Sequence, residues 1–188
     1  GYHSLNLFDD VSLPTGHDRV GSLDACAYQN YVVPRSLPCV MIQMGGCEYA
    51  NSSPPEGIST GAGVPNAPEL SNLRGTVAMA KLSGDPDSAT SQFFINLGNN
   101  ASNLDVQNSG FTVIGQVIGN GMDVVDTMAA LPRFNYGGAL TDLPLRDFSV
   151  ADATNGVEPN EDNLVVISDI VVIDAATVTN PDIVPVAN

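Results

Sequence analysis

The apolar residues of this chain come in short runs, and clusters rich in glycine and proline separate one run from the next. Short apolar runs that contain β-branched residues and end in such clusters are typical of strands. The strands are expected over residues 2–8, 32–43 (bent at its prolines), 76–81, 92–97, 111–118 and 164–173. One segment, 121–131, has a helical spacing of apolar residues and stops at Pro132, and 23–28 has room for one or two helical turns. Many short strands with one or two helices indicate a β-barrel or sandwich.

The length and composition of the chain fit a single folded domain. Its 188 residues are 43% hydrophobic and 14% charged, which supplies enough apolar material for one sizeable core. We expect this domain over residues 1–174 and an acidic, proline-containing tail over 175–188. Residues 50–68 are rich in serine, proline, glycine and asparagine and are expected to form a long surface loop. No apolar run approaches the ~20 residues that a membrane-spanning helix needs, so no membrane span is expected.

The charge of the chain is strongly negative. Twenty-one acidic side chains stand against five arginines and one lysine, Lys81, which gives a formal net charge of −15. A surface of this sign repels phosphate backbones, so nucleic acid is not an expected partner. Two interpretations of the charge stay open: a protein suited to high salt, where screening weakens self-repulsion, and a plain acidic secreted bacterial protein.

The cysteines and the acidic clusters predict no metal site. Cys26, Cys39 and Cys47 have spacings that match no common zinc pattern, and three cysteines do not make a disulfide framework. Small buried thiols and a Cys39–Cys47 bridge are both compatible with them. The acidic residues of 147–162 lack the alternating ligand spacing of a calcium loop. Neither a metal nor a cofactor is expected.

Three segments carry the functional prediction. Residues 75–97 read GTVAMAKLSGDPDSATSQFFINL, residues 104–126 read LDVQNSGFTVIGQVIGNGMDVVD, and residues 35–43 read RSLPCVMIQ. In these segments the chain resembles the cyclophilin family, especially its bacterial members. The resemblance implies a mainly β fold, a closed eight-stranded antiparallel barrel capped by two helices. It also implies a peptidyl-prolyl cis/trans isomerase, which binds proline-containing polypeptides in a groove on the outside of the barrel.

The same resemblance assigns roles to individual residues. Arg35 would donate to the nitrogen of the twisted imide, while Gln43 and Gln92 would hold the substrate backbone and orient the arginine. An apolar pocket would receive the proline ring and exclude water. The residues expected to bind substrate are Val40, Met41, Ala80, Phe94, Leu104 and Phe111. A fixed arginine stabilises the perpendicular amide electrostatically, without an acid–base or covalent step, so this chemistry needs no cofactor.

The chain departs from the family pattern beside the arginine. Val33-Pro34 and Cys39-Val40 stand where the family usually has Phe-His and Gly-Phe, and the smaller Val40 removes on the order of 1 kcal/mol of contact from the pocket. Two functions therefore stay open. The first is an isomerase that acts on exported proteins in the periplasm or outside a bacterial cell. The alternative is a non-catalytic structural or assembly subunit of the same fold, which polymerises by strand or tail exchange because its first strand is short.

Overall fold

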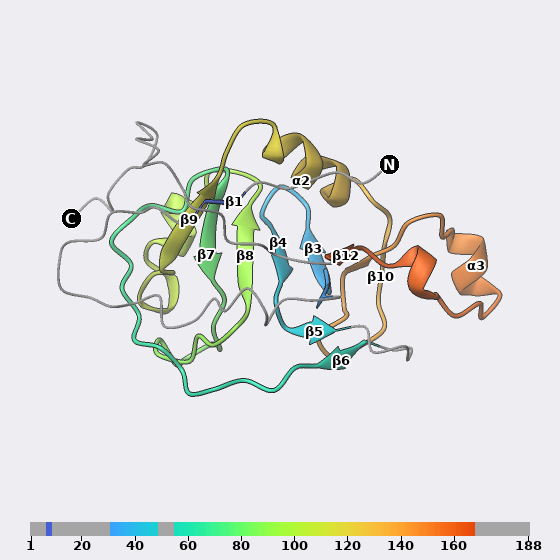
Figure 1. Ribbon diagram of the computed structural model, residues 1–188, viewed down its shortest axis with the longest axis horizontal. Helices are drawn as coiled ribbons and strands as arrows, with labels where there is room; N and C mark the ends of the chain where they lie inside the picture. The colour runs from blue at the N-terminus through green and yellow to red at the C-terminus, as the bar shows by residue number, and fades with distance from the viewer. Residues whose placement is uncertain (1–6, 9–30, 49–54, 168–188) are drawn as a thin grey trace.

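The largest element of the fold is a six-stranded sheet, seen in the computed structural model, which describes residues 7–8, 31–48 and 55–167. Every neighbouring pair in this sheet is antiparallel, and the sheet occupies the middle of the view in Figure 1. In spatial order the strands are β1 (Leu7–Phe8), β9 (Val113–Val117), β7 (Thr76–Met79), β8 (Phe93–Asn96), β4 (Met41–Met44) and β3 (Arg35–Leu37). Five of these strands fall within segments that the apolar runs predicted, and β4 extends one residue beyond its segment, to Met44.

A smaller sheet combines parts of the predicted strands 32–43 and 164–173 with two strands that were not predicted, β5 and β6. Its four members, in spatial order, are β12 (Val166–Ile167), β2 (Tyr31–Val32), β5 (Cys47–Glu48) and β6 (Glu56–Gly57). The chain passes from β2 to β3 through Pro34, whose missing N–H cannot continue a strand ladder, so the two strands belong to different sheets. A third pairing joins β10 (Arg133–Phe134) to β11 (Leu143–Pro144). Among the described residues these sheets are not joined into one closed ring.

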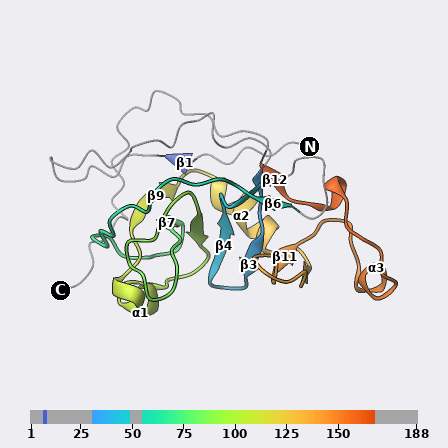
Figure 2. The same ribbon diagram turned by 90° about the horizontal axis from the view of Figure 1, so that it is seen from below.

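The predicted helix is present, and two shorter ones accompany it. Helix α2 (Gly121–Ala129) begins where its apolar spacing begins and ends before Pro132. Helices α1 (Ala101–Leu104) and α3 (Val150–Thr154) lie at opposite ends of the molecule in Figure 2 and were not expected, because four or five residues are too few for a periodic apolar face. Two 3-10 turns, η2 (Gln107–Ser109) and η3 (Glu161–Asn163), complete the described elements. Of the helices in the described part of the chain, none combines the length and the hydropathy that spanning a bilayer requires.

The six-stranded sheet is packed on both faces, because alternate residues of a strand point to opposite sides. On one face, Ile42 and Met44 of β4 join Phe93 and Ile95 of β8 in a fully apolar core, which Val125 of α2 covers. The other face carries a smaller apolar cluster around Phe94. A third cluster, which contains Val32, packs β2 against the segment that includes β11. The smaller cluster around Phe94 contains residues that the sequence predicted to bind substrate.

Some predictions fall on residues outside the described ranges and stay predictions. These include the helical turns at 23–28, the acidic tail at 175–188 and most of the strands expected at 2–8 and 164–173. The described part of the expected loop, from residue 55 to residue 68, is mostly exposed and holds only β6 and an isolated bridge from Val64 to Ala89. Cys39 and Cys47 are both free thiols, so the bridge that their spacing allowed is not formed.

Candidate active site

Four residues form a row across the outer face of the six-stranded sheet. Arg35 of β3 is the register partner of Gln43 of β4, and Gln43 is the register partner of Phe94 of β8. Phe94 in turn faces Ala78 of β7. Because directly paired residues of antiparallel strands project from the same face, the arginine, the glutamine and the aromatic ring stand side by side. Two of the three predicted catalytic residues are thus placed in one row by strand register alone.

The polar end of this row contains an amide pair and a half-exposed guanidinium. The side-chain Nε2 of Gln43 donates to Oε1 of Gln92 over 2.6 Å, which fixes the two amides against each other. Nε of Arg35 lies 3.4 Å from Oδ2 of Asp142, and the two side chains are 39% and 34% exposed. At that distance and exposure the ion pair is weak and serves mainly to orient the guanidinium. The three predicted catalytic residues therefore lie together at the surface.

The apolar end of the row is a cluster that we call the groove cluster. Its aromatic pair, Phe94 and Phe111, has ring centroids 5.7 Å apart and an interplanar angle of 76°, an edge-to-face contact that aromatic rings favour. The cluster consists of buried Ala78, Phe94, Leu104 and Val113 and partly buried Met41, Leu70, Ala80 and Phe111. It therefore brings together five of the six residues predicted to bind substrate.

The sixth, Val40, lies outside this cluster. It belongs to the turn between β3 and β4, where its N–H donates to the carbonyl of Leu37 over 3.1 Å. Its own carbonyl accepts from the Leu97 N–H at 2.9 Å and from Nδ2 of Asn100 at 2.8 Å. The backbone of Val40 thus holds the turn to the next strand, while its side chain is not among those that pack around Phe94.

A hydrogen-bond network around the buried side chains of Asn72 and Asn96 anchors the end of helix α1, which supplies Leu104, and the loop that supplies Phe111, and sequence reasoning missed it. Nδ2 of Asn72 donates to Oδ1 of Asp105 over 3.0 Å and to the Phe111 carbonyl over 3.1 Å. Nδ2 of Asn96 donates to Oδ1 of Asn72 over 3.2 Å, so the network reaches β8. Buried polar groups need such partners, and these bonds hold the far wall of the groove cluster against the sheet. Asn96 and Asp105 lie in the segments that resemble the family, but a polar residue gives no hydropathy signal of burial.

The partner of Arg35 was also missed. Asp142 is 107 positions away along the chain, and its backbone carbonyl accepts from the Ser36 N–H over 3.0 Å. It sits in a bridge beside β3, at the start of the segment that leads into β11. A contact of this sequence separation leaves no local pattern, so only the folded chain reveals it.

Two other features of the described residues lie apart from the row. One is a hollow of about 370 Å³, and none of the nine predicted site residues lines it. Its lining consists of Pro55, Tyr136, Leu140, Leu143, Glu158, Pro159 and Leu164. Within the described ranges, no three His, Cys, Asp or Glu side chains gather closely enough to hold a metal ion.

Comparison with known protein families identifies the fold. The family model described as cyclophilin type peptidyl-prolyl cis-trans isomerase/CLD matches residues 13–155. The chain therefore belongs to the cyclophilin-type peptidyl-prolyl cis-trans isomerase family. This confirms the resemblance found in the sequence, the mainly β cyclophilin fold and the enzyme class that the family represents.

Three bacterial proteins are similar to this chain in sequence. A peptidyl-prolyl cis-trans isomerase of Acinetobacter baylyi is 44% identical over 113 residues, which cover 58% of this chain and 57% of that protein. Peptidyl-prolyl cis-trans isomerase A of Dickeya dadantii is 40% identical over 69% of this chain and 67% of the relative. Peptidyl-prolyl cis-trans isomerase B of Escherichia coli is 35% identical over 80% of this chain and 91% of the relative. The chain thus spans little more than half of the Acinetobacter protein and most of the Escherichia coli one.

A solved structure agrees with the fold. The crystal structure of a Cryptosporidium parvum cyclophilin type peptidyl-prolyl cis-trans isomerase, in the presence of the dipeptide ala-pro, matches with a TM-score of 0.50 and 19% identity. The match covers 79% of this chain and 78% of that chain. At this identity the match shows the shared fold.

Proposed function

We propose that this chain catalyses the cis/trans isomerisation of peptide bonds that precede proline, on the outer face of its six-stranded sheet. The observation that carries the proposal is the row in which Arg35 and the Gln43–Gln92 pair stand beside the groove cluster. A cation and an amide pair beside an apolar patch offer hydrogen-bond donors to a peptide backbone and an apolar surface to a proline ring. The dipeptide named with the Cryptosporidium relative is a ligand of the same chemical class.

The chemistry that such a row performs follows from the electronic structure of the amide. Rotation about an amide bond has a barrier of about 18–20 kcal/mol because the nitrogen lone pair is delocalised into the carbonyl. Unaided isomerisation of an X–Pro bond takes on the order of tens to hundreds of seconds. Twisting the bond localises the lone pair on nitrogen, which then becomes a hydrogen-bond acceptor.

Arg35 is the group that would use this acceptor. Its guanidinium would donate to the imide nitrogen only when the bond is twisted, and so would stabilise the transition state more than either planar isomer. Phe94, Leu104 and Met41 would hold the proline ring and exclude water that competes for the lone pair. Gln43 and Gln92, locked to each other at 2.6 Å, would present their remaining amide groups to the substrate backbone.

The test is a proline-peptide isomerisation assay on the purified chain. We expect a rate enhancement proportional to protein concentration, and Arg35→Ala should lower kcat/KM by about 10²–10³-fold, as for the loss of one preorganised donor. Arg146→Ala is the matched control, because Arg146 is exposed and donates to the backbone carbonyl of Asp162. A wild-type rate equal to that of solvent would reject the proposal in favour of a non-catalytic subunit, whereas an Arg35→Ala variant as fast as an active wild type would reject the role of Arg35.

We also propose that the substrates are exported proteins and that the chain works in the periplasm or outside the cell. The support is the acidic, lysine-poor composition of the chain together with its bacterial relatives. Fractionation of the source cells tests the location: recovery of the protein with cytoplasmic markers alone would contradict it. Self-assembly by strand or tail exchange stays a prediction, and light scattering at high protein concentration tests it.

A further inference from the structure

Lys81 lies at the edge of the groove cluster and is the sole lysine of the chain. It follows Ala80, a member of that cluster, two residues after the end of β7. Its Nζ stands 4.9 Å from the centroid of the Phe111 ring and donates to the carbonyl of Gly110. A cation over an aromatic face at this distance is held by the ring quadrupole. The ammonium group is therefore fixed beside one wall of the cluster in which a proline ring would bind.

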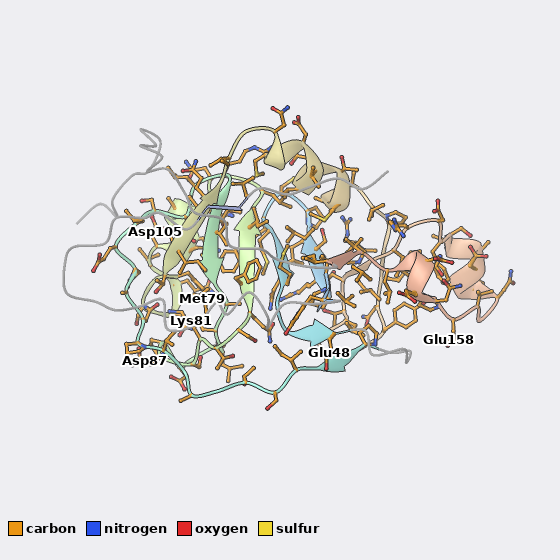
Figure 3. The ribbon with its side chains drawn as sticks, in the orientation of Figure 1. Glu48, Met79, Lys81, Asp87, Asp105 and Glu158 are labelled. Atoms are coloured by element: carbon orange, nitrogen blue, oxygen red, sulfur yellow. The ribbon has the colours of Figure 1, made fainter. Side chains whose placement is uncertain are left out.

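Lys81 also lacks a carboxylate partner among the described residues. Arg35 pairs with Asp142 and Arg74 pairs with Asp126, whereas within those ranges no acidic oxygen lies within ion-pairing distance of Nζ of Lys81. Asp87, the acidic residue that acts on it electrostatically, is seen near it in Figure 3 and accepts a hydrogen bond from the Asn66 N–H over 2.8 Å. Burial lowers the pKa of Lys81, while the charge of Asp87 raises it. The positive charge of Lys81 is therefore only partly compensated, because the direct contacts of its ammonium group are a carbonyl oxygen and an aromatic ring.

We propose that Lys81 is a specificity-determining residue that selects peptides with a carboxylate side chain within about two residues of the isomerised proline; this rests on the function proposed above. The distances set the range. The Phe94 and Phe111 centroids are 5.7 Å apart and Nζ lies 4.9 Å from the Phe111 centroid, so Nζ is no farther from the Phe94 ring than the sum of these two distances. An extended peptide advances about 3.3 Å per residue, so a glutamate one or two residues from a proline on Phe94 reaches the ammonium group.

The position of Lys81 relative to Arg35 supports this assignment. Arg35 lies on β3 and Lys81 follows β7, so the two cations stand on opposite sides of the β4 and β8 strands that carry Gln43 and Phe94. Neighbouring strands are about 4.8 Å apart, which separates the two cations by roughly three strand spacings. One cation is therefore placed to act on the imide while the other meets a neighbouring side chain of the same peptide.

A purely structural role for Lys81 is the competing explanation, because its bond to Gly110 joins two loops. The same two loops are also joined by hydrogen bonds that do not involve Lys81. Nδ2 of Asn108 donates to the Leu82 carbonyl over 2.9 Å, and its Oδ1 accepts from the Gly84 N–H over 3.2 Å. The loops therefore keep two hydrogen bonds when the lysine is replaced, and the two roles can be separated experimentally.

The experiment compares peptides that differ in one residue. Two sets are needed, with glutamate, glutamine or lysine placed either two residues before or two residues after the proline. At about 0.15 M salt the Debye length is ~8 Å, so the far field of the acidic molecule is damped while a direct contact persists. We expect kcat/KM for the glutamate peptide to exceed that for the glutamine peptide by about twofold to fivefold in one of the sets, as for a partly exposed ion pair.

Variants of Lys81 decide between the two roles. Lys81→Met, which keeps the length of the side chain, should abolish the glutamate preference, and Lys81→Arg should retain it. A Lys81→Met variant that slows all peptides equally, or a wild type that treats glutamate and glutamine alike in both sets, would overturn the inference.

A binding measurement keeps this test independent of catalysis. The same peptides are titrated onto wild type and Lys81→Met, and the chemical-shift changes of Phe111 are followed by NMR. A glutamate preference in binding that is lost in Lys81→Met, without any isomerisation, would uphold the role of Lys81 and reject the proposed activity. Equal binding of the glutamate and glutamine peptides by wild type would count against Lys81 whether or not isomerisation is observed.

Discussion

Among the cations of the described residues, Arg35 is the one that combines an acidic partner with a half-exposed position on the face of the six-stranded sheet. Its Nε is directed to Asp142 at 3.4 Å, and its register partner is Gln43. A guanidinium carries five N–H donors in a fixed plane, so a contact at Nε orients the fork without occupying the remaining donors. Asp142 is therefore a positioning residue in the proposed reaction.

Replacing this partner should loosen the arginine without unfolding the protein. We expect Asp142→Asn to lower kcat/KM by up to about fivefold, the equivalent of an exposed ion pair worth at most ~1 kcal/mol. The melting temperature should change little. Steady-state kinetics and thermal unfolding of the variant measure the two effects separately.

The control for Asp142→Asn is Asp126→Asn. Asp126 pairs with Arg74 at 2.7 Å on the exposed surface, so its loss removes an ion pair of the same kind away from the groove cluster. In addition, Asp142→Asn should have no further effect in an Arg35→Ala background, because a positioning residue acts through the group that it positions. Equal activity of the two asparagine variants would contradict the assignment.

Residue-level prediction from the sequence is possible where the residue lies in a recognisable segment, and the catalytic roles named in this way stay predictions. Arg35, Gln43 and Gln92 were named from segments that resemble a family, and strand register and one hydrogen bond bring them together. Asp142 was not named, because its partner is 107 positions away and a single aspartate has no pattern. Val40 was named as a pocket residue, whereas its side chain lies outside the groove cluster.

At the scale of elements, the junction between β4 and β5 determines where Gln92 can lie. Gly45 has φ = +82°, a conformation that favours glycine, and a Cβ there would come within 2.6 Å of the Ser91 carbonyl oxygen. At Gly46 a Cβ would lie 2.5 Å from Cδ of Gln92. The two glycines thus let the chain pass close beside the segment that leads into β8 and leave room for the Gln92 side chain.

A methyl group at position 46 should therefore impair the site without damaging the core. We expect Gly46→Ala to displace the flexible Gln92 side chain, break its hydrogen bond to Gln43 and lower kcat/KM roughly threefold to tenfold, which matches about 0.5–1.5 kcal/mol for one hydrogen bond. Gly61→Ala is the matched control, since nothing lies within 4 Å of a Cβ there. Kinetics and melting curves of both variants give the answer, and a Gly46→Ala protein with full activity would show that Gln92 is not needed.

The elements that the sequence predicted well are those with a strong local pattern. Strands β7, β8 and β9 and helix α2 have long apolar runs or a clear helical spacing, and they lie where expected. The division of strands between two sheets was not predictable in this way, because it depends on long-range pairing such as β2 with β12. Strands of two residues, such as β10 and β11, are also too short to show an alternation.

At the scale of the whole molecule, the large negative net charge is the main electrostatic feature. A net charge of −15 on 188 residues means that most acidic groups have no cation to pair with, and the described residues contain two ion pairs. Self-repulsion of this kind weakens the compact state and is screened by salt. The two ion pairs are exposed, so screening them with salt lowers the free energy of unfolding only slightly.

Added sodium chloride should therefore stabilise the protein. The Debye length falls from about 30 Å at 0.01 M to about 3 Å at 1 M, which removes repulsion between distant carboxylates while it scarcely affects the core. Each kcal/mol added to the free energy of unfolding raises the melting temperature of a chain of this size by roughly 2–4 °C. Melting curves across this range measure the effect, and chloride is preferred because sulfate stabilises proteins generally by exclusion.

The control is the same series near the sequence pI of 4.1, where the net charge and hence the salt effect should shrink. A melting temperature that falls with chloride at neutral pH would mean that local ion pairs outweigh the overall repulsion.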